Sequence, residues 1–81
     1  MNREQLFETV AQLVALHSPS GVETEVDEYL LSRLTAIGEP RVDEAGNIIL
    51  RFEGRDPTGL VAIAAHKDEI GAMVKRVDEN G

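Results

Sequence analysis

The chain has 81 residues, enough for one small domain with a marginal core, and its 42% apolar content excludes a disordered tail. Its 8 Lys and Arg against 15 Asp and Glu residues give a net charge of −7, which argues against nucleic acid or an anionic membrane as partner. No cysteine is present, so disulfides and thiolate metal sites are excluded. The longest apolar run, Leu60 to Ala65, is far too short to cross a membrane, and we expect an acidic cytoplasmic protein.

The first predicted element is a helix over residues 2–17. An apolar stripe at helical spacing supports it and consists of Leu6, Val10, Leu13, Val14 and His17. Asn2 is the expected N-cap, and Gln5, three residues later, completes a capping box. Because His17 lies near the expected C-terminus of this helix, where a ring N–H or a positive charge is favourable, we assign it a structural role.

A second helix is predicted after a break at residues 17–21. Ser20 is its expected N-cap, with Glu23 as the capping-box partner. Gly38 is the expected stop of this helix, and Pro40 follows it. The apolar stripe of the helix consists of Val22, Val26, Tyr29, Leu30, Leu34 and Ile37.

Apolar residues then follow a period of two. Residues 41–43 and 47–52 predict two antiparallel strands joined by a turn at 44–46, and a polar loop is expected over residues 53–59. Residues 60–65 are apolar on both faces, which predicts a central strand covered on both sides. Residues 70–77 predict a further strand. The expected fold class is therefore α/β, with two helices followed by the first strands of a mixed sheet.

The last residues, Asp78 to Gly81, carry a turn signal. Asn-Gly after a strand is the strongest short-range signal for a hairpin turn, and such a turn needs a returning strand. No residues for that strand follow, so we expect the chain to be the N-terminal portion of a longer protein. The alternative is a frayed natural terminus.

His66 and Asp68 form the candidate site. They follow the predicted central strand, at the strand end where ligand sites collect in open α/β sheets. In extended backbone, residues two apart point to the same side, so the Asp68 carboxylate is expected to approach the His66 imidazole. That contact would fix the ring tautomer and leave the other nitrogen for a metal, while Lys67 and Glu69 face the other way. The simpler alternative is a surface ion pair.

Other catalytic motifs do not occur. Gly54 and Gly59 have phosphate-loop spacing, but apolar residues stand where Lys and Ser or Thr are required. There is no Gly-x-Ser-x-Gly elbow and no thiol nucleophile. Adjacent acid pairs such as Asp68-Glu69, Asp27-Glu28 and Asp43-Glu44 are expected to be mostly solvated faces or turn residues. A catalytic zinc takes about three protein ligands plus water, so His66 by itself would be only part of a site.

The segment Leu60 to Gly71, LVAIAAHKDEIG, resembles the metal-binding strand of the self-compartmentalising metalloaminopeptidases. This family includes glutamyl and deblocking aminopeptidases and TET-like enzymes, and some members are labelled cellulases or endoglucanases. The resemblance extends over the whole chain, through the Pro-Ser-Gly turn with Glu23, the helix to Gly38 and the Val-Asp-x-x-Gly-Asn hairpin of residues 42–49. Related two-zinc exopeptidases also use His-x-Asp, but usually without Glu-Ile-Gly after it.

The resemblance implies that His66 is a metal ligand and that Asp68 is the catalytic acid that supports the site beside it. Lys67 stands where many members have Met. The resemblance further implies two zinc or cobalt ions, a bridging Asp, a Glu general base and other ligands downstream, so that this chain holds at most one ligand. Residues 1–71 would be the N-terminal part of an incomplete two-zinc exopeptidase-like catalytic domain. Residues 72–81 would be the truncated start of an inserted oligomerisation domain.

The function implied by the resemblance is metal-dependent hydrolysis of N-terminal residues from peptides, with an activated water as nucleophile. The full enzyme would be a homo-oligomer of dodecamer type that acts on peptide substrates, with no nucleic-acid or membrane partner. The chain alone is expected to be inactive. One alternative is a non-catalytic α/β module that joins a partner chain through exposed strand edges. Another is a relative in a different two-zinc exopeptidase or deacylase family.

Overall fold

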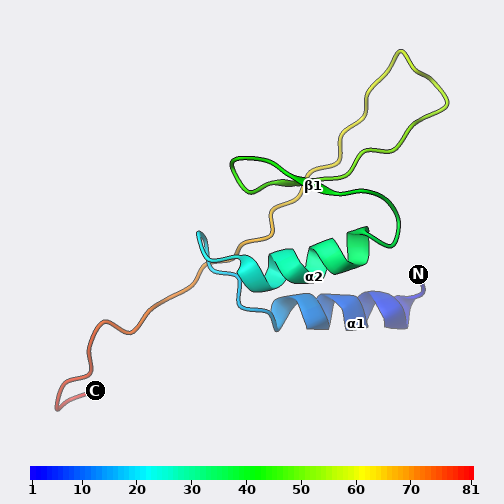
Figure 1. Ribbon diagram of the computed structural model, residues 1–81. Helices are drawn as coiled ribbons and strands as arrows, with labels where there is room; N and C mark the ends of the chain where they lie inside the picture. Colours follow the sequence, from blue (N-terminus) through cyan, green and yellow to red (C-terminus); the bar gives the residue numbers. More distant parts are fainter.

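The computed structural model describes residues 1–81 as two helices, a small hairpin and a long extended segment (Figure 1). Helix α1 spans Arg3–Val14 and helix α2 spans Thr24–Leu34. Strands β1, Arg41–Val42, and β2, Ile48–Ile49, form a two-stranded antiparallel sheet. Two helices followed by strands agree with the predicted α/β class.

Helix α1 begins with the predicted capping box. The Asn2 side chain accepts a hydrogen bond from the Gln5 backbone N–H at 2.8 Å, and the Gln5 side chain accepts one from the Asn2 backbone N–H at 2.9 Å. Two N–H groups at the helix start are thereby satisfied. The predicted end at His17 is wrong, because the helix ends at Val14 and the His17 backbone N–H donates to the Glu25 carboxylate instead of a helical carbonyl.

The predicted capping box of Ser20 and Glu23 at the start of α2 is wrong. Glu23 occupies the N-cap position and makes no side-chain cap hydrogen bond. The residues before it form a tight turn, in which the Val22 N–H donates to the Pro19 carbonyl at 2.9 Å and Gly21 adopts a φ of 87°. Glycine tolerates this left-handed backbone, which the third position of a type II turn requires. Ser20 therefore belongs to a turn and not to a helix cap.

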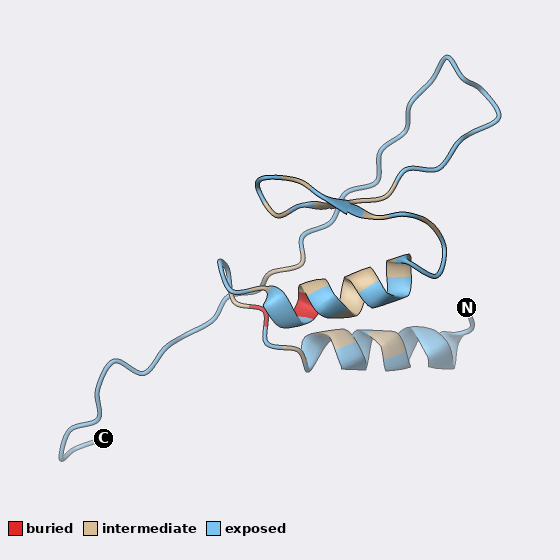
Figure 2. Cartoon of the chain, viewed as in Figure 1, coloured by how far each residue is buried: buried red, intermediate tan, exposed pale blue.

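Helices α1 and α2 lie side by side and run antiparallel (Figure 1). The side-chain oxygen of Gln12 on α1 accepts hydrogen bonds from the Tyr29 hydroxyl at 2.8 Å and from the Arg33 guanidinium at 3.0 Å, both on α2. Val26, on the predicted apolar stripe of α2, is buried at 4% exposure (Figure 2). On α1 the contact comes from Gln12, which lies off the predicted apolar stripe, whereas Tyr29 lies on the predicted stripe of α2. Leu6, Val10 and Val14 of the α1 stripe stay exposed, so the two helices bury little apolar surface.

The predicted hairpin is confirmed, with strands shorter than the expected 41–43 and 47–52. The Asp43 carboxylate closes the turn by accepting hydrogen bonds from the Asn47 backbone N–H at 2.8 Å and from its side-chain amide at 2.9 Å. Gly46 adopts a φ of 86° within this turn, where a side chain would be strained. The register places Arg41 opposite Ile49 and Val42 opposite Ile48.

The strands predicted at residues 60–65 and 70–77 are wrong for this structure. Neither stretch joins a sheet, and their large apolar side chains are all at least 77% exposed (Figure 2). A strand requires a neighbour to receive its backbone hydrogen bonds, and the hairpin does not extend to either stretch. The expected mixed sheet is replaced by the antiparallel hairpin and one isolated parallel bridge, between Pro19 and Glu69.

The chain is elongated. Its radius of gyration is 17.2 Å, whereas a compact domain of this length has a radius of about 12 Å. The loop before residue 65 and the terminal stretch 72–81 project away from the helices in opposite directions (Figure 1). Buried residues are limited to Val26 and Ser18, which agrees with the predicted marginal core. None of the helices is long and apolar enough to cross a membrane.

Candidate functional site

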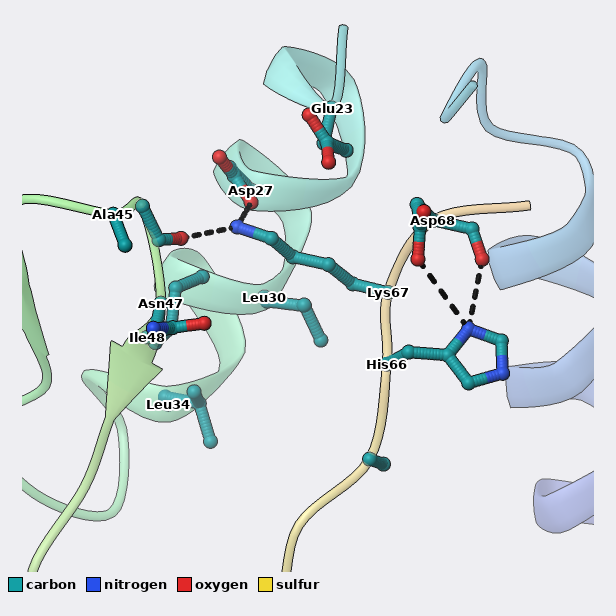
Figure 3. Close-up of a pocket in the computed structure, with 12 residues that line it drawn as sticks. Glu23, Asp27, Leu30, Leu34, Ala45, Asn47, Ile48, His66, Lys67 and Asp68 are labelled. Atoms are coloured by element: carbon teal, nitrogen blue, oxygen red, sulfur yellow. Dashed lines mark hydrogen bonds and ion pairs between the residues drawn. The ribbon is translucent and has the colours of Figure 1, made fainter. Parts of the chain in front are cut away.

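Residues His66 to Gly71, here called the site segment, pass between the turn that joins the helices and the face of α2 that carries Asp27 (Figure 3). The start of the segment borders a pocket of about 380 Å³. The pocket wall is shared by α2, the hairpin turn and residues 65–68. Contacts on both sides of the segment determine where its side chains point.

His66 and Asp68 lie side by side, as their spacing predicts. Nδ1 of His66 lies 2.9 Å from the backbone carbonyl oxygen of Asp68 and 3.5 Å from its carboxylate Oδ1 (Figure 3). A carbonyl oxygen can only accept a hydrogen bond, so Nδ1 donates and carries the proton. In the neutral ring Nε2 then has a free lone pair, on a side chain that is 85% exposed.

Asp68 is held on its other side by Ser20. The Ser20 hydroxyl donates to Oδ2 of Asp68, although 48 residues separate the two in the sequence. This hydrogen bond is the largest cause of the lowered pKa of Asp68; burial opposes it by raising the pKa, and the nearby His66 lowers the pKa further. The carboxyl group is therefore ionised at neutral pH, when it attracts the Nδ1–H of the imidazole.

The backbone of the site segment is attached to the turn that precedes α2. The Glu69 N–H donates to the Ser18 carbonyl at 2.9 Å, next to the parallel bridge between Pro19 and Glu69. Gly71 lies so close to this turn that a Cβ atom at residue 71 would be 2.8 Å from the Pro19 Cβ. The turn and the site segment are thus in direct backbone contact, and a glycine permits the close approach.

Lys67 points away from His66, as predicted (Figure 3). Its ammonium group donates to Oδ1 of Asp27 on α2 and, at 2.6 Å, to the Gly46 carbonyl in the hairpin turn. The Lys67 and Asp27 side chains are 22% and 32% exposed, so this ion pair is partly shielded from water. Side chains alternate in direction along extended backbone, which explains why the neighbouring residues His66 and Lys67 point to opposite sides of the site segment.

The side chains of this chain do not form a complete metal site. No group of three or more His, Cys, Asp or Glu residues is arranged to hold an ion. His66 offers one ring nitrogen, and Asp68 is engaged by the ring and by Ser20. His17, the other histidine, is exposed and lies outside any such group. The assignments of His66 as a metal ligand and Asp68 as a catalytic acid stay predictions.

Sequence reasoning missed Ser20 and Asp27. The sequence predicts Ser20 as the N-cap of α2. Pro-Ser-Gly is also typical of a tight turn with glycine at its third position. In such a turn the Ser20 hydroxyl does not cap the helix and is available to another partner. Asp27 was expected to be a solvated acid. No local pattern connects it with Lys67, because 40 residues separate them.

Comparison with known proteins connects the chain with one peptidase family. The model of the M42 glutamyl aminopeptidase family matches residues 46–81, which include the site segment. A protein of Acetivibrio thermocellus with an aminopeptidase name is 32% identical over 100% of this chain, and a glutamyl aminopeptidase of Lactococcus lactis is 32% identical over 95% of it. A protein of Pyrococcus furiosus with a LysW-lysine/LysW-ornithine hydrolase name is 30% identical over 100% of the chain. The chain spans 24%, 22% and 24% of the length of these relatives, and no solved structure matches it.

Proposed function

The chain belongs to the M42 glutamyl aminopeptidase family, and on this basis we propose that it is the N-terminal segment of a metal-dependent aminopeptidase that removes N-terminal residues from peptides. In this proposal residues 1–71 are part of a two-zinc exopeptidase-like catalytic domain, and residues 72–81 begin an inserted oligomerisation domain. The full-length protein would act on peptides as a homo-oligomer. The family match and the aminopeptidase names of the relatives support the activity.

The observation that carries the proposal is the geometry of His66. Its Nδ1 donates toward Asp68, and its Nε2 has a free lone pair on an exposed ring. Histidines that bind metals almost always donate their second ring N–H to a carbonyl or carboxylate, which fixes the tautomer and raises the basicity of the ligating nitrogen. We therefore propose that His66 binds a metal through Nε2 and that Asp68 orients the ring.

The donor group also fits the proposed metal. Imidazole nitrogen is a preferred ligand of zinc, and a catalytic zinc site takes about three protein ligands. Since His66 belongs to no group of three or more such ligands in this chain, the proposal assigns the remaining ligands of two zinc or cobalt ions, and a Glu general base, to other parts of the full-length protein. When bound, such ions would supply Lewis-acid chemistry, polarising the peptide carbonyl and lowering the pKa of a water molecule. The task of Asp68 is to keep the proton on Nδ1 of His66, so that Nε2 stays free to bind.

The test compares His66→Gln with His17→Gln in the full-length protein that contains this sequence. We expect the parent protein and His17→Gln to hold equal amounts of zinc or cobalt per subunit and to hydrolyse aminoacyl p-nitroanilides equally. His66→Gln is expected to lose at least part of this metal, with kcat/KM reduced by more than about a hundredfold. If His66→Gln keeps both its metal content and its kcat/KM, the proposed role of His66 is wrong.

The match to the Pyrococcus furiosus protein favours a second candidate function. The name of that relative describes a hydrolase of LysW-lysine or LysW-ornithine, so in this second candidate function the same site would separate lysine or ornithine from LysW. The two functions share the proposed ligand and differ in substrate. Comparing kcat/KM for peptides with kcat/KM for LysW loaded with lysine separates them, because each predicts a preference for its own substrate.

A further inference from the structure

The Ser20 hydroxyl reaches Asp68 from the turn that joins the two helices. The Val22 N–H closes this turn by donating to the Pro19 carbonyl at 2.9 Å, and Gly21 supplies the positive φ of 87°. Ser20 is thus the second residue of the turn and lies outside α2. Its hydroxyl donates to Oδ2 of Asp68 and is not needed to cap the helix.

Without this contact, the Asp68 carboxylate would be held only by its longer contact with His66. Its other carboxylate oxygen, Oδ1, lies 3.5 Å from Nδ1 of His66, and the side chain is 37% exposed, so water competes for the carboxylate. The hydrogen bond from the Glu69 N–H to the Ser18 carbonyl holds the main chain but leaves χ1 of Asp68 unrestricted among its staggered positions. The bond from Ser20 to Oδ2 therefore selects the rotamer in which Oδ1 faces the imidazole.

We propose that Ser20 is a positioning residue that prepares His66 for metal binding by holding the Asp68 carboxylate against the ring. An anionic oxygen that faces Nδ1 favours the Nδ1–H tautomer and increases the electron density on Nε2. Ser20 acts through Asp68 and touches neither metal nor substrate. This inference rests on the proposed role of His66 as a ligand.

The test is a Co²⁺ titration of the metal-free, full-length protein, followed by the visible absorption of the bound ion and independent of activity. We expect Ser20→Ala to weaken Co²⁺ binding about tenfold, the lower end of the range for losing a group that supports a ligand. Ser20→Thr keeps the hydroxyl and restores most of the affinity. Ser32→Ala is the matched control, because the Ser32 hydroxyl donates to the Tyr29 carbonyl at 2.7 Å within α2, and it leaves Co²⁺ binding unchanged.

A second pair of variants distinguishes positioning from a general structural effect. In an Asp68→Ala background, Ser20→Ala is expected to cause no further loss of Co²⁺ affinity, since the carboxylate through which Ser20 acts on His66 is already absent. A structural role of Ser20 would lower the affinity in both backgrounds and would overturn the proposal. Ser20→Cys, which keeps a weak donor of similar size, is expected to give an intermediate affinity.

The failure of this inference is distinguishable from the failure of the proposed function. If Ser20→Ala binds Co²⁺ with parent affinity and spectrum while His66→Gln loses an ion, Ser20 has no positioning role and the proposed function stands. If His66→Gln binds Co²⁺ as the parent does, the proposed function and the inference built on it both fail.

Discussion

Lys67 and Asp27, 40 residues apart in the sequence, form the ion pair that connects the site segment to helix α2. The same ammonium group donates to the Gly46 carbonyl at 2.6 Å, so one side chain joins the segment, α2 and the hairpin. His66 lies on the opposite side of the segment, where it is 85% exposed (Figure 3). The segment is thus anchored through one side while the other side presents the imidazole.

Replacement of Lys67 by Met tests this anchor. Lys67→Met removes the partner of Asp27 and the donor to the Gly46 carbonyl, and we expect the free energy of unfolding to fall by about 1 kcal/mol, since the pair is only partly shielded from water. Urea unfolding of the full-length protein measures the change. Lys75→Met is the control, because Lys75 is exposed and forms no ion pair.

A double-mutant cycle with Asp27→Asn separates the ion pair from the effect of each side chain alone. We expect a coupling energy of about 0.5–1 kcal/mol between Lys67 and Asp27. Additive effects of the two substitutions would contradict the assignment of this pair as the anchor.

The hairpin turn is expected to weaken in acid because of Asp43. The side-chain hydrogen bond from Asn47 is the main cause that lowers the pKa of Asp43 below its ordinary 3.8, and backbone N–H groups of Asn47 and Ala45 add to it. The stabilisation by these bonds is therefore fully present above pH 3.8 and is lost as the pH falls through the lower, folded-state pKa. An NMR titration of the Asn47 amide is expected to show this transition.

Two variants check the origin of that transition. Asp43→Ala removes the acceptor, so the Asn47 amide is expected to show no such acid transition. Glu44→Gln changes the neighbouring carboxylate, which accepts no hydrogen bond in the structure, and leaves the transition in place. An unchanged transition in Asp43→Ala would contradict the assignment.

The close approach of Gly71 and Pro19 predicts a specific effect of adding one methyl group. In Gly71→Ala the new Cβ would lie 2.8 Å from the Pro19 Cβ, so the site segment must move away from the turn. We expect faster hydrogen exchange at the Glu69 amide, which donates to the Ser18 carbonyl at 2.9 Å. Gly59→Ala is the control, because nothing lies within 4 Å of the position of its Cβ. If the Glu69 amide exchanges equally fast in both variants, the close contact between Gly71 and Pro19 does not exist in solution.

The 81-residue chain by itself is expected to have no peptidase activity with added zinc or cobalt. The physical reason is the donor count, because His66 is one imidazole and a catalytic site takes about three protein ligands. An aminoacyl amide assay of the isolated chain beside the full-length protein measures this. Sustained turnover that scales with the concentration of the isolated chain would contradict the expectation.

Local interactions were predictable where both partners lie within a few residues of each other. The capping box of Asn2 and Gln5 spans three residues, and the hairpin turn of Asp43 and Asn47 spans four. The approach of the Asp68 carboxylate to 3.5 Å from Nδ1 of His66 followed from the two-residue period of extended backbone, although the shorter contact of that nitrogen is with the Asp68 backbone carbonyl. In these cases the chain geometry limits the available partners so strongly that residue type and spacing are sufficient.

Partners beyond a few residues were not predictable in the same way. The apolar pattern of residues 60–65 predicted a strand, but a strand exists only when a neighbour receives its backbone hydrogen bonds, and no neighbour does so here. Ser20 illustrates the same limit, because a serine hydroxyl can serve a helix N-terminus or a distant carboxylate with equal chemistry.

By itself, the sequence determined the helix start at Asn2, the hairpin at Asp43 and the shared direction of His66 and Asp68, since each depends on bonds that close within one turn or two extended residues. Only the tertiary structure decided that the Ser20 hydroxyl donates a hydrogen bond to Asp68 and that Lys67 forms an ion pair with Asp27. These two contacts join segments that are 48 and 40 residues apart in the sequence, and the spacing of residues along the chain does not predict which distant segments fold against each other.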